Sequence, residues 1–302
     1  MNKPWIAEFD VKAETARRLI QLQFPQLKID HLEELGEGFD NTVFMVNRDY
    51  VFRFPKRQVS VDLLRVENSL LPELVSQVPL SIPAPQFIGH PSEAYPFPFT
   101  GYKLLKGKVP GKIPMESRLS SAPHFARFLK ALHSFPVKRA ESLGVEPDRL
   151  NRINVNVRVP MFRKRIEQLE QLGFSREAKL AAACLHSLSG CSDTGIKNVL
   201  VHGDIHIRNV IVNNEGQLTG VIDWGDVHIG NPAIDISFIY SFLPKSGRKL
   251  FYTIYGTVDE ETKNLARFKS VYTTVMLFLY GIDRKDESLI ASAKTSLELA
   301  LK

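Results

Sequence analysis

The segment that most constrains the fold lies in the last third of the chain, where short apolar runs flank a polar loop. Residues 198–202 and 209–212 are apolar runs on either side of the sequence His-Gly-Asp-Ile-His-Ile-Arg-Asn. Asn-Asn-Glu-Gly at 213–216 predicts a turn, and residues 218–223 are typical of a returning strand. These patterns predict a β-hairpin embedded in a chain region that is otherwise helical.

This hairpin would gather the residue types that phosphoryl transfer requires. It would bring Asn209 and Asp223 to the same end of a small sheet, one loop away from Asp204. In such chemistry one carboxylate orients the acceptor hydroxyl and takes its proton, while a second carboxylate and an amide hold Mg²⁺. His-Gly-Asp or Asp-Trp-Gly-Asp alone is more often an ordinary turn. The presence of both motifs in this order, within a strand–turn–strand pattern, favours a catalytic site.

The rest of the chain predicts an α+β fold with two lobes. Up to about residue 106, strands and turns predominate, with a hairpin at 41–46 and 50–54, a helix at 61–74 and extended segments between 79 and 98. From 107 to 302 the apolar spacing is mostly helical. One helical candidate at 166–188 contains Gly173, a possible break. We therefore expect a small β-rich lobe at 1–106 and a larger helical lobe at 107–302, with the crossover near 101–107.

The first lobe contains candidate nucleotide-binding residues. Gly36 and Gly38 open the first hairpin and would let the backbone approach a phosphate, although such a pair is often only a turn. Val51 and Arg53 share one face of the next strand, which would put Val51 over a base and the Arg53 cation on phosphates. Glu67 follows on the helix and is a possible partner of Arg53. A surface ion pair is the alternative.

Residues 201–237, VHGDIHIRNVIV through GVIDWGDVHIGNPAIDIS, resemble the aminoglycoside phosphotransferase family, whose protein-kinase-like members include the macrolide phosphotransferases. The resemblance extends from about Leu35 to the C-terminal helices. It implies a protein-kinase-like fold, Asp204 as catalytic base, Asn209 and Asp223 as Mg²⁺ ligands, and ATP or GTP as donor. Residues 101–105, with Tyr102 and Leu104, would form the hinge that binds the base.

Three further positions qualify the resemblance. Asp235 matches a family position that we interpret as structural. Arg53 stands where many members have Lys, and it keeps the charge and can bind phosphate through two nitrogens. Asn209 is the general residue of the family, whereas the macrolide and 2″-aminoglycoside kinases tend to have His there. The narrow subfamily therefore stays open.

The acceptor is inferred from the C-terminal half. Residues 236–244 and 273–280 are apolar and aromatic, and they would suit a large, weakly charged molecule such as a macrolide. Equally, they are typical of a helix core that never contacts substrate. The acids Asp259, Glu260 and Glu261 could instead serve a polycation. We favour a macrolide acceptor over an aminoglycoside. The alternatives are another metabolite and a catalytically silent nucleotide-binding protein.

Charge and cysteine usage add weaker constraints. The formal net charge is +6, and residues 107–200 hold 16 Lys and Arg against 8 Asp and Glu. A solvated helix face explains this excess better than nucleic-acid binding, because no aromatic-interleaved motif accompanies it. Cys184 and Cys191 fit no metal or redox spacing and predict buried free thiols. With no signal peptide or membrane span evident, we expect a cytoplasmic protein without membrane or nucleic-acid partners.

Overall fold

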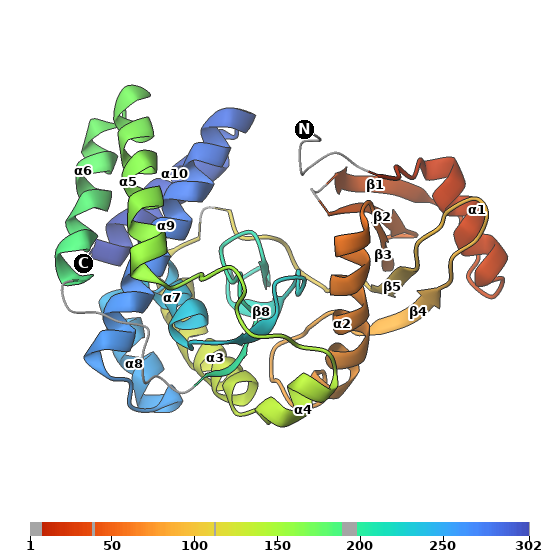
Figure 1. Cartoon of the computed structure of the whole chain (residues 1–302), viewed down its shortest axis with the longest axis horizontal. Helices are drawn as coiled ribbons and strands as arrows, with labels where there is room; N and C mark the ends of the chain where they lie inside the picture. Colours follow the sequence, from red (N-terminus) through yellow and green to blue (C-terminus); the bar gives the residue numbers. More distant parts are fainter. Residues whose placement is uncertain (1–7, 38–39, 112, 189–197, 302) are drawn as a thin grey trace. The chain divides into compact units, whose positions relative to one another are not determined.

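The structure is a computed structural model that describes residues 8–37, 40–111, 113–188 and 198–301 (Figure 1). Gly38 and Cys191, both singled out from the sequence, lie outside these ranges. The chain divides into two compact units. One comprises Met1–Gln77 and Ser81–Lys106, and the other comprises Val78–Leu80 and Gly107–Lys302. Each unit is described by itself below.

The N-terminal unit is built on a five-stranded antiparallel sheet with the strand order β1-β2-β3-β5-β4. The strands are β1 (Leu32–Glu37), β2 (Asn41–Val46), β3 (Tyr50–Pro55), β4 (Pro85–Gly89) and β5 (Phe99–Lys103). Two helices, α1 (Ala13–Gln23) and α2 (Gln58–Leu74), belong to the same unit. The hairpin predicted at 41–54 is therefore present as β2 and β3, and the predicted helix begins three residues earlier than expected.

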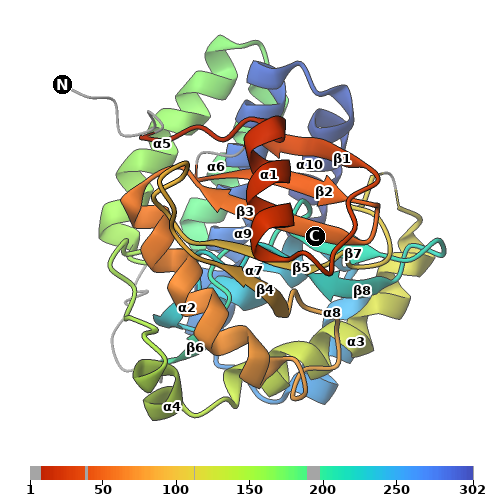
Figure 2. The ribbon, with the colours of Figure 1, turned by 90° about the vertical axis from the view of Figure 1, so that its right-hand side faces the viewer.

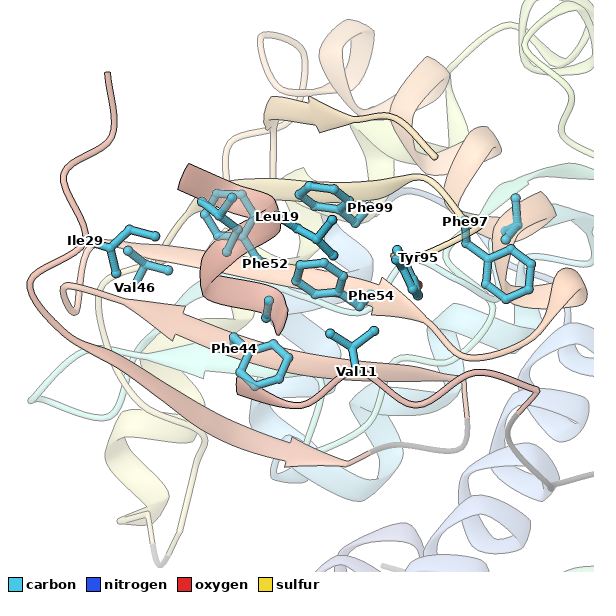
Figure 3. Close-up of a cluster of buried hydrophobic side chains, with 13 residues drawn as sticks. Val11, Leu19, Ile29, Phe44, Val46, Phe52, Phe54, Tyr95, Phe97 and Phe99 are labelled. Carbon is cyan, nitrogen blue, oxygen red and sulfur yellow. The ribbon is translucent and has the colours of Figure 1, made fainter. Parts of the chain in front are cut away.

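Alternation along β3 divides the unit into two faces. Phe52 and Phe54 are fully buried and point into an aromatic cluster with Phe99, Tyr95 and the apolar face of α1 (Figure 3). Figure 2 shows α1 lying across the strands of this sheet. Arg53 points to the opposite face, where it meets α2. We did not predict α1 from the sequence, although its buried Leu19 and Ile20 contribute to this core.

The C-terminal unit is mainly helical. Its helices are α3 (Met115–His133), α4 (Val137–Ser142), α5 (Val155–Gln171), α6 (Ser175–Ala183), α7 (Ala233–Phe242), α8 (Lys245–Tyr255), α9 (Glu260–Arg284) and α10 (Glu287–Leu301), with a 3₁₀ turn at Cys184–Leu188. The helix predicted at 166–188 is in fact two helices. The first of these, α5, begins before residue 166 because the side chain of Asn154 caps it, accepting hydrogen bonds from the backbone N–H groups of Asn156 and Val157. The break lies between α5 and α6, where Gly173 adopts φ +88°.

Two small β-ladders interrupt these helices. The predicted hairpin is present as β7 (Val210–Val212) and β8 (Leu218–Val221), which pair antiparallel. The preceding strand, β6 (Val199–Val201), instead pairs with β9 (His228–Gly230), a strand that we did not predict. The loop with the His-Gly-Asp sequence is thus held between two ladders. The observed architecture is the expected α+β fold.

Most apolar residues of the first run that we considered as a substrate wall, 236–244, are core residues, whereas Met276, Leu277 and Leu279 of the second run are partly buried. Ile236, Phe238 and Phe242 of α7 are at most 2% exposed, because α7 packs against both α9 and α10. Val275 and Phe278 of α9 are fully buried as well. The wall that favoured a macrolide is therefore not present in α7. Separately, none of the described helices combines the length and apolarity needed to cross a membrane.

Candidate active site

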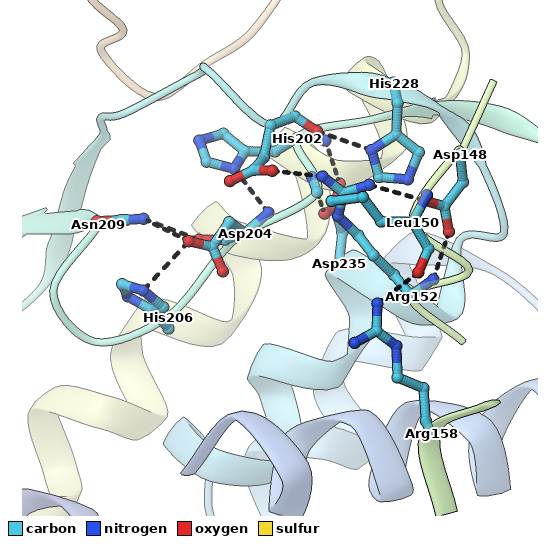
Figure 4. A network of polar contacts seen from close by, with 12 residues as sticks. Asp148, Leu150, Arg152, Arg158, His202, Asp204, His206, Asn209, His228 and Asp235 are labelled. Atoms are coloured by element: carbon cyan, nitrogen blue, oxygen red, sulfur yellow. Dashed lines mark hydrogen bonds and ion pairs between the residues drawn. The ribbon is translucent and has the colours of Figure 1, made fainter. Parts of the chain in front are cut away.

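The loop between β6 and β7 is anchored by one buried carboxylate. Asp235, in the first turn of α7, accepts hydrogen bonds from the backbone N–H groups of His202 (2.8 Å) and Gly203 (3.0 Å) (Figure 4). His133 Nε2 of α3 lies 3.2 Å from the same carboxylate. Burial would raise the pKa of Asp235, but these hydrogen bonds and the nearby histidines hold it below its usual value. Asp235 therefore has the structural position that the sequence suggested.

Gly203 fills a position that no other residue can occupy without strain. Its φ is +90°, in the region that favours glycine. A Cβ at this position would lie 2.2 Å from the backbone oxygen of Asp226.

Asp204 is held as an accessible carboxylate. Its side chain keeps 33% of its surface exposed, and Oδ2 lies 3.4 Å from Nε2 of His206. Nδ2 of Asn209 donates to the backbone oxygen of Asp204 at 3.0 Å and lies 3.4 Å from Oδ2. Burial would raise the pKa of Asp204, but the charges of His206, Lys269 and His202 outweigh that effect and lower it. The carboxylate is therefore ionised at neutral pH and able to accept a proton or a hydrogen bond.

His206 is a site residue that we did not single out from the sequence. It lies two residues after Asp204 in the same motif, so the signal was present in the quoted segment. Lys269 of α9, whose charge helps to lower the pKa of Asp204, is distant in sequence and belongs to no recognisable motif. Only the packing of α9 beside the loop identifies it.

Asn209 and Asp223 are brought together as expected. Val210 pairs with Val221, and the backbone oxygen of Asn209 accepts from N–H of Ile222 at 2.9 Å. Both residues therefore lie at one end of the β7–β8 hairpin. Asp223 is exposed and has φ +64°, a conformation uncommon for a residue other than glycine and a frequent mark of functional sites.

The two residues fit Mg²⁺. Because Nδ2 of Asn209 is used as a donor to Asp204, its Oδ1 is the atom left to face a cation. One amide oxygen and one carboxylate suit Mg²⁺, which keeps several waters and takes further oxygens from phosphates. No group of three or more His, Cys, Asp and Glu forms a metal cage among the described residues.

Arg152 pairs with two further carboxylates near the loop, those of Asp148 and Asp226. Its Nη1 lies 2.7 Å from Asp148, its Nη2 donates to Asp226, and its backbone N–H also donates to Asp148. Burial lowers the pKa of Arg152, but its carboxylate partners raise it overall. The carboxylate of Asp226 is therefore paired with the guanidinium of Arg152, whereas that of Asp204 lies beside His206.

The candidate nucleotide-binding residues belong to the N-terminal unit. Nη1 of Arg53 lies 2.6 Å from Oε2 of Glu67, and their side chains are 10% and 5% exposed. The surface-pair alternative is therefore wrong. Val51, on the same face, is buried, and Gly36 lies in β1. Tyr102 is in β5, and the N–H of Leu104 just beyond it donates to the backbone oxygen of Asp49.

The fold and this loop define a kinase-like phosphotransferase. The sequence profile of the Phosphotransferase enzyme family (APH) matches residues 31–269. The chain belongs to this family, and the kinase-like fold and the enzyme class predicted from the sequence are confirmed.

Solved structures resemble most of the chain. The GDP and kanamycin complex of APH(2″)-IIIa is 28% identical with a TM-score of 0.67, and the match covers 94% of this chain and 97% of that one. Macrolide 2′-phosphotransferase MphH from Brachybacterium faecium is 21% identical with a TM-score of 0.58, over 93% and 97%. Likenesses to aminoglycoside and macrolide kinases are thus both present, and the branch is not resolved.

A curated protein also matches part of the chain. The uncharacterized protein YcbJ of Bacillus subtilis is 30% identical over 69 residues, which is 23% of this chain. The match spans only 18% of the YcbJ sequence.

Proposed function

We propose that this chain is a magnesium-dependent phosphotransferase that transfers the γ-phosphoryl group of ATP or GTP to a hydroxyl group of a small molecule. The observation that carries the proposal is the ionised, accessible carboxylate of Asp204 beside the hairpin end that presents Asn209 and Asp223. This is the set of groups that phosphoryl transfer uses: one to position the nucleophile and two to hold the metal.

Asp204 would orient the acceptor hydroxyl and take its proton as the hydroxyl oxygen bonds to the γ-phosphorus. The bond from that phosphorus to the β–γ bridging oxygen breaks, and the nucleoside diphosphate leaves. Asn209 and Asp223 would hold Mg²⁺, which supplies positive charge to the phosphate oxygens. His206 would keep the Asp204 carboxylate in place and Asn209 would fix its backbone, so most of the rate arises from positioning.

In this proposal residues 1–106 bind the nucleotide, and residues 107–302 supply the catalytic groups. Arg53, fixed by the buried Glu67, would place its cation on the phosphates, with Gly36 and Gly38 approaching them through their backbone. Val51, Tyr102 and Leu104 would contact the base. Nucleotide binding by related proteins supports this assignment, since the solved relatives include GDP and ADP complexes.

The acceptor is an open part of the proposal. One related structure contains kanamycin, which supports an aminoglycoside. The macrolide that we favoured from the sequence rested on two apolar runs, 236–244 and 273–280. The burial of the α7 residues removes the first run as support, whereas Met276, Leu277 and Leu279 of the second run are only partly buried. An antibiotic hydroxyl of either kind is therefore the first acceptor to screen.

The decisive variant is Asp204→Asn. We expect acceptor-dependent diphosphate release to fall by about 10²-fold or more, with nucleotide affinity unchanged, because only the proton acceptor is removed. Asp283→Asn, at an exposed position of α9, is the matched control and should behave as the wild type. Full turnover in the Asp204 variant would exclude this carboxylate as the base.

A further inference from the structure

The segment that contains the proposed metal ligand Asp223 forms a tight turn whose far end is held in place. Asp223 has φ +64°, and the backbone N–H of Val227 donates to the oxygen of Trp224 at 3.1 Å, which closes the turn. The near end of the turn is joined to the β7–β8 hairpin. Asp226 is the residue through which the far end is held.

Arg152 holds the side chain of Asp226. Its guanidinium donates through Nη2 to the Asp226 carboxylate and through Nη1 to Asp148, at 2.7 Å (Figure 4). The Arg152 side chain is 13% exposed, whereas that of Asp226 is 45% exposed. A guanidinium that serves two carboxylates through separate nitrogens has a fixed orientation, because its donors form a rigid fork. The buried guanidinium therefore determines where the more exposed carboxylate lies.

Arg152 is itself held by residues outside the turn. Its backbone N–H donates to the Asp148 carboxylate at 2.6 Å. Asp148 is joined to β9, since its own N–H donates to the backbone oxygen of Ile229 at 3.1 Å. The N–H of Ile229 donates in turn to the oxygen of Glu146 at 2.8 Å. Residues 146–148 therefore run along β9 and hold Arg152 beside the turn.

His228 holds the backbone of Asp226. Its Nδ1 donates to the backbone oxygen of Asp226 at 2.7 Å, and its side chain is buried. The ring also lies against the catalytic loop, because a Cβ at Gly203 would be 2.8 Å from Nδ1. A Cβ at Gly230 would be 2.8 Å from Nε2. The imidazole thus contacts both the catalytic loop and the turn that contains Asp223.

We propose that Arg152 and His228 are positioning residues that fix Asp223 for Mg²⁺ binding through their joint hold on Asp226. The inference rests on the phosphotransferase function proposed above, since it concerns the metal site of that function. Both residues act through Asp226, which follows the ligand closely in the chain. Groups that orient metal ligands in this way contribute about 10- to 100-fold to metal affinity.

The test is binding of Mn²⁺ to the full chain in the presence of ADP, measured by electron paramagnetic resonance with ADP alone as the blank. Mn²⁺ serves as the probe because it prefers the same oxygen ligands as Mg²⁺. We expect Arg152→Met to weaken Mn²⁺ binding about 10-fold or more. Arg149→Met is the matched control, since Arg149 forms an exposed surface pair with Glu146, and this variant should bind Mn²⁺ as the wild type does.

Two substitutions of His228 separate positioning from packing. In His228→Asn the side-chain NH₂ can replace the Nδ1–H group, so donation to Asp226 and most of the Mn²⁺ affinity should remain. His228→Leu is closer to histidine in size but has no donor, so Mn²⁺ binding should weaken. A packing role alone predicts the reverse order. Thermal unfolding of each variant without metal checks that the fold is intact.

A double-mutant cycle tests whether Arg152 acts through Asp226. Asp226→Asn alone should weaken Mn²⁺ binding. Adding Arg152→Met to that variant should weaken it little further, because both changes break the same contact. The cycle and the His228 variants also decide the matter if Arg152→Met alone does not fold.

Three results overturn the inference: a folded Arg152→Met protein that binds Mn²⁺ as tightly as the wild type, greater affinity in His228→Leu than in His228→Asn, or fully additive losses in the cycle. Each of these leaves the phosphotransferase proposal standing if the wild type binds Mn²⁺ and diphosphate release depends on Asp204. A wild type that binds no Mn²⁺ in the presence of ADP would instead refute the metal site itself, and the inference with it.

Discussion

Removing the charge of Asp235 should both destabilise the protein and displace the catalytic loop. This carboxylate is fully buried and receives the N–H groups of His202 and Gly203 at 2.8 and 3.0 Å, with His133 Nε2 at 3.2 Å. Asp235→Asn keeps the shape of the side chain. It replaces one accepting oxygen with an NH₂ group, which then faces a donor.

The magnitude follows from these contacts. Hydrogen bonds to a charged acceptor contribute about 1.5–3 kcal/mol each, and breaking a buried charged network costs about 3–5 kcal/mol. We expect Asp235→Asn to lower the free energy of unfolding by about 3–4 kcal/mol. For a chain of this size that corresponds to a fall in Tm of roughly 10 °C.

The dependence on pH has a defined sign. The pKa of Asp235 is lower in the folded state than in the unfolded chain, where a carboxyl titrates near ~4. Its contribution is therefore present above about pH 4 and is lost as pH falls through the folded-state pKa. The stability difference between the wild type and Asp235→Asn should shrink in acid.

Urea unfolding followed by circular dichroism, at pH 7 and at successively lower pH, measures both effects. Asp283→Asn is the control, since Asp283 is exposed on α9. An Asp235→Asn protein within about 0.5 kcal/mol of the wild type at pH 7 would refute the reasoning, because surface substitutions change stability by no more than that.

Two further predictions concern single contacts. Glu67→Gln should cost about 3 kcal/mol in urea unfolding and weaken nucleotide binding in a titration, because it removes the carboxylate that pairs with the buried Arg53. Glu33→Gln, in a surface pair with His31, should do neither. Gly203→Ala should cost ~2 kcal/mol or more and abolish diphosphate release, because its Cβ would meet a backbone oxygen at 2.2 Å. Gly173→Ala has a similar φ and open space around it, so it should retain turnover; equal losses in both variants would point to backbone strain alone.

The parts of the fold that could be predicted from the sequence are those with local signals. The β7–β8 hairpin carries a strong turn sequence between short apolar runs, and it is present at almost the expected residues. The two faces of β3 follow from strict alternation. Within the candidate site, the loop and hairpin place Asp204, Asn209 and Asp223 because all three lie within twenty residues of one another.

Features that depend on distant contacts could not be predicted. Strand β9 is three residues long and is defined by its pairing with β6, which no local sequence pattern indicates. The burial of α7 depends on α9 and α10, which pack on it, and composition does not distinguish a core helix from an apolar wall. Lys269 lies sixty-five residues after Asp204, in a helix without a motif, and only tertiary packing relates the two charges.

The most direct test of the central claim is transfer of a labelled γ-phosphate from ATP or GTP to an acceptor by the purified full chain with Mg²⁺. Erythromycin and kanamycin serve as acceptors, and each is assayed with the wild type and with Asp204→Asn. The account predicts label on at least one acceptor with the wild type and label reduced by about 10²-fold or more with the variant. Label on no acceptor, or equal label with both proteins, would contradict it.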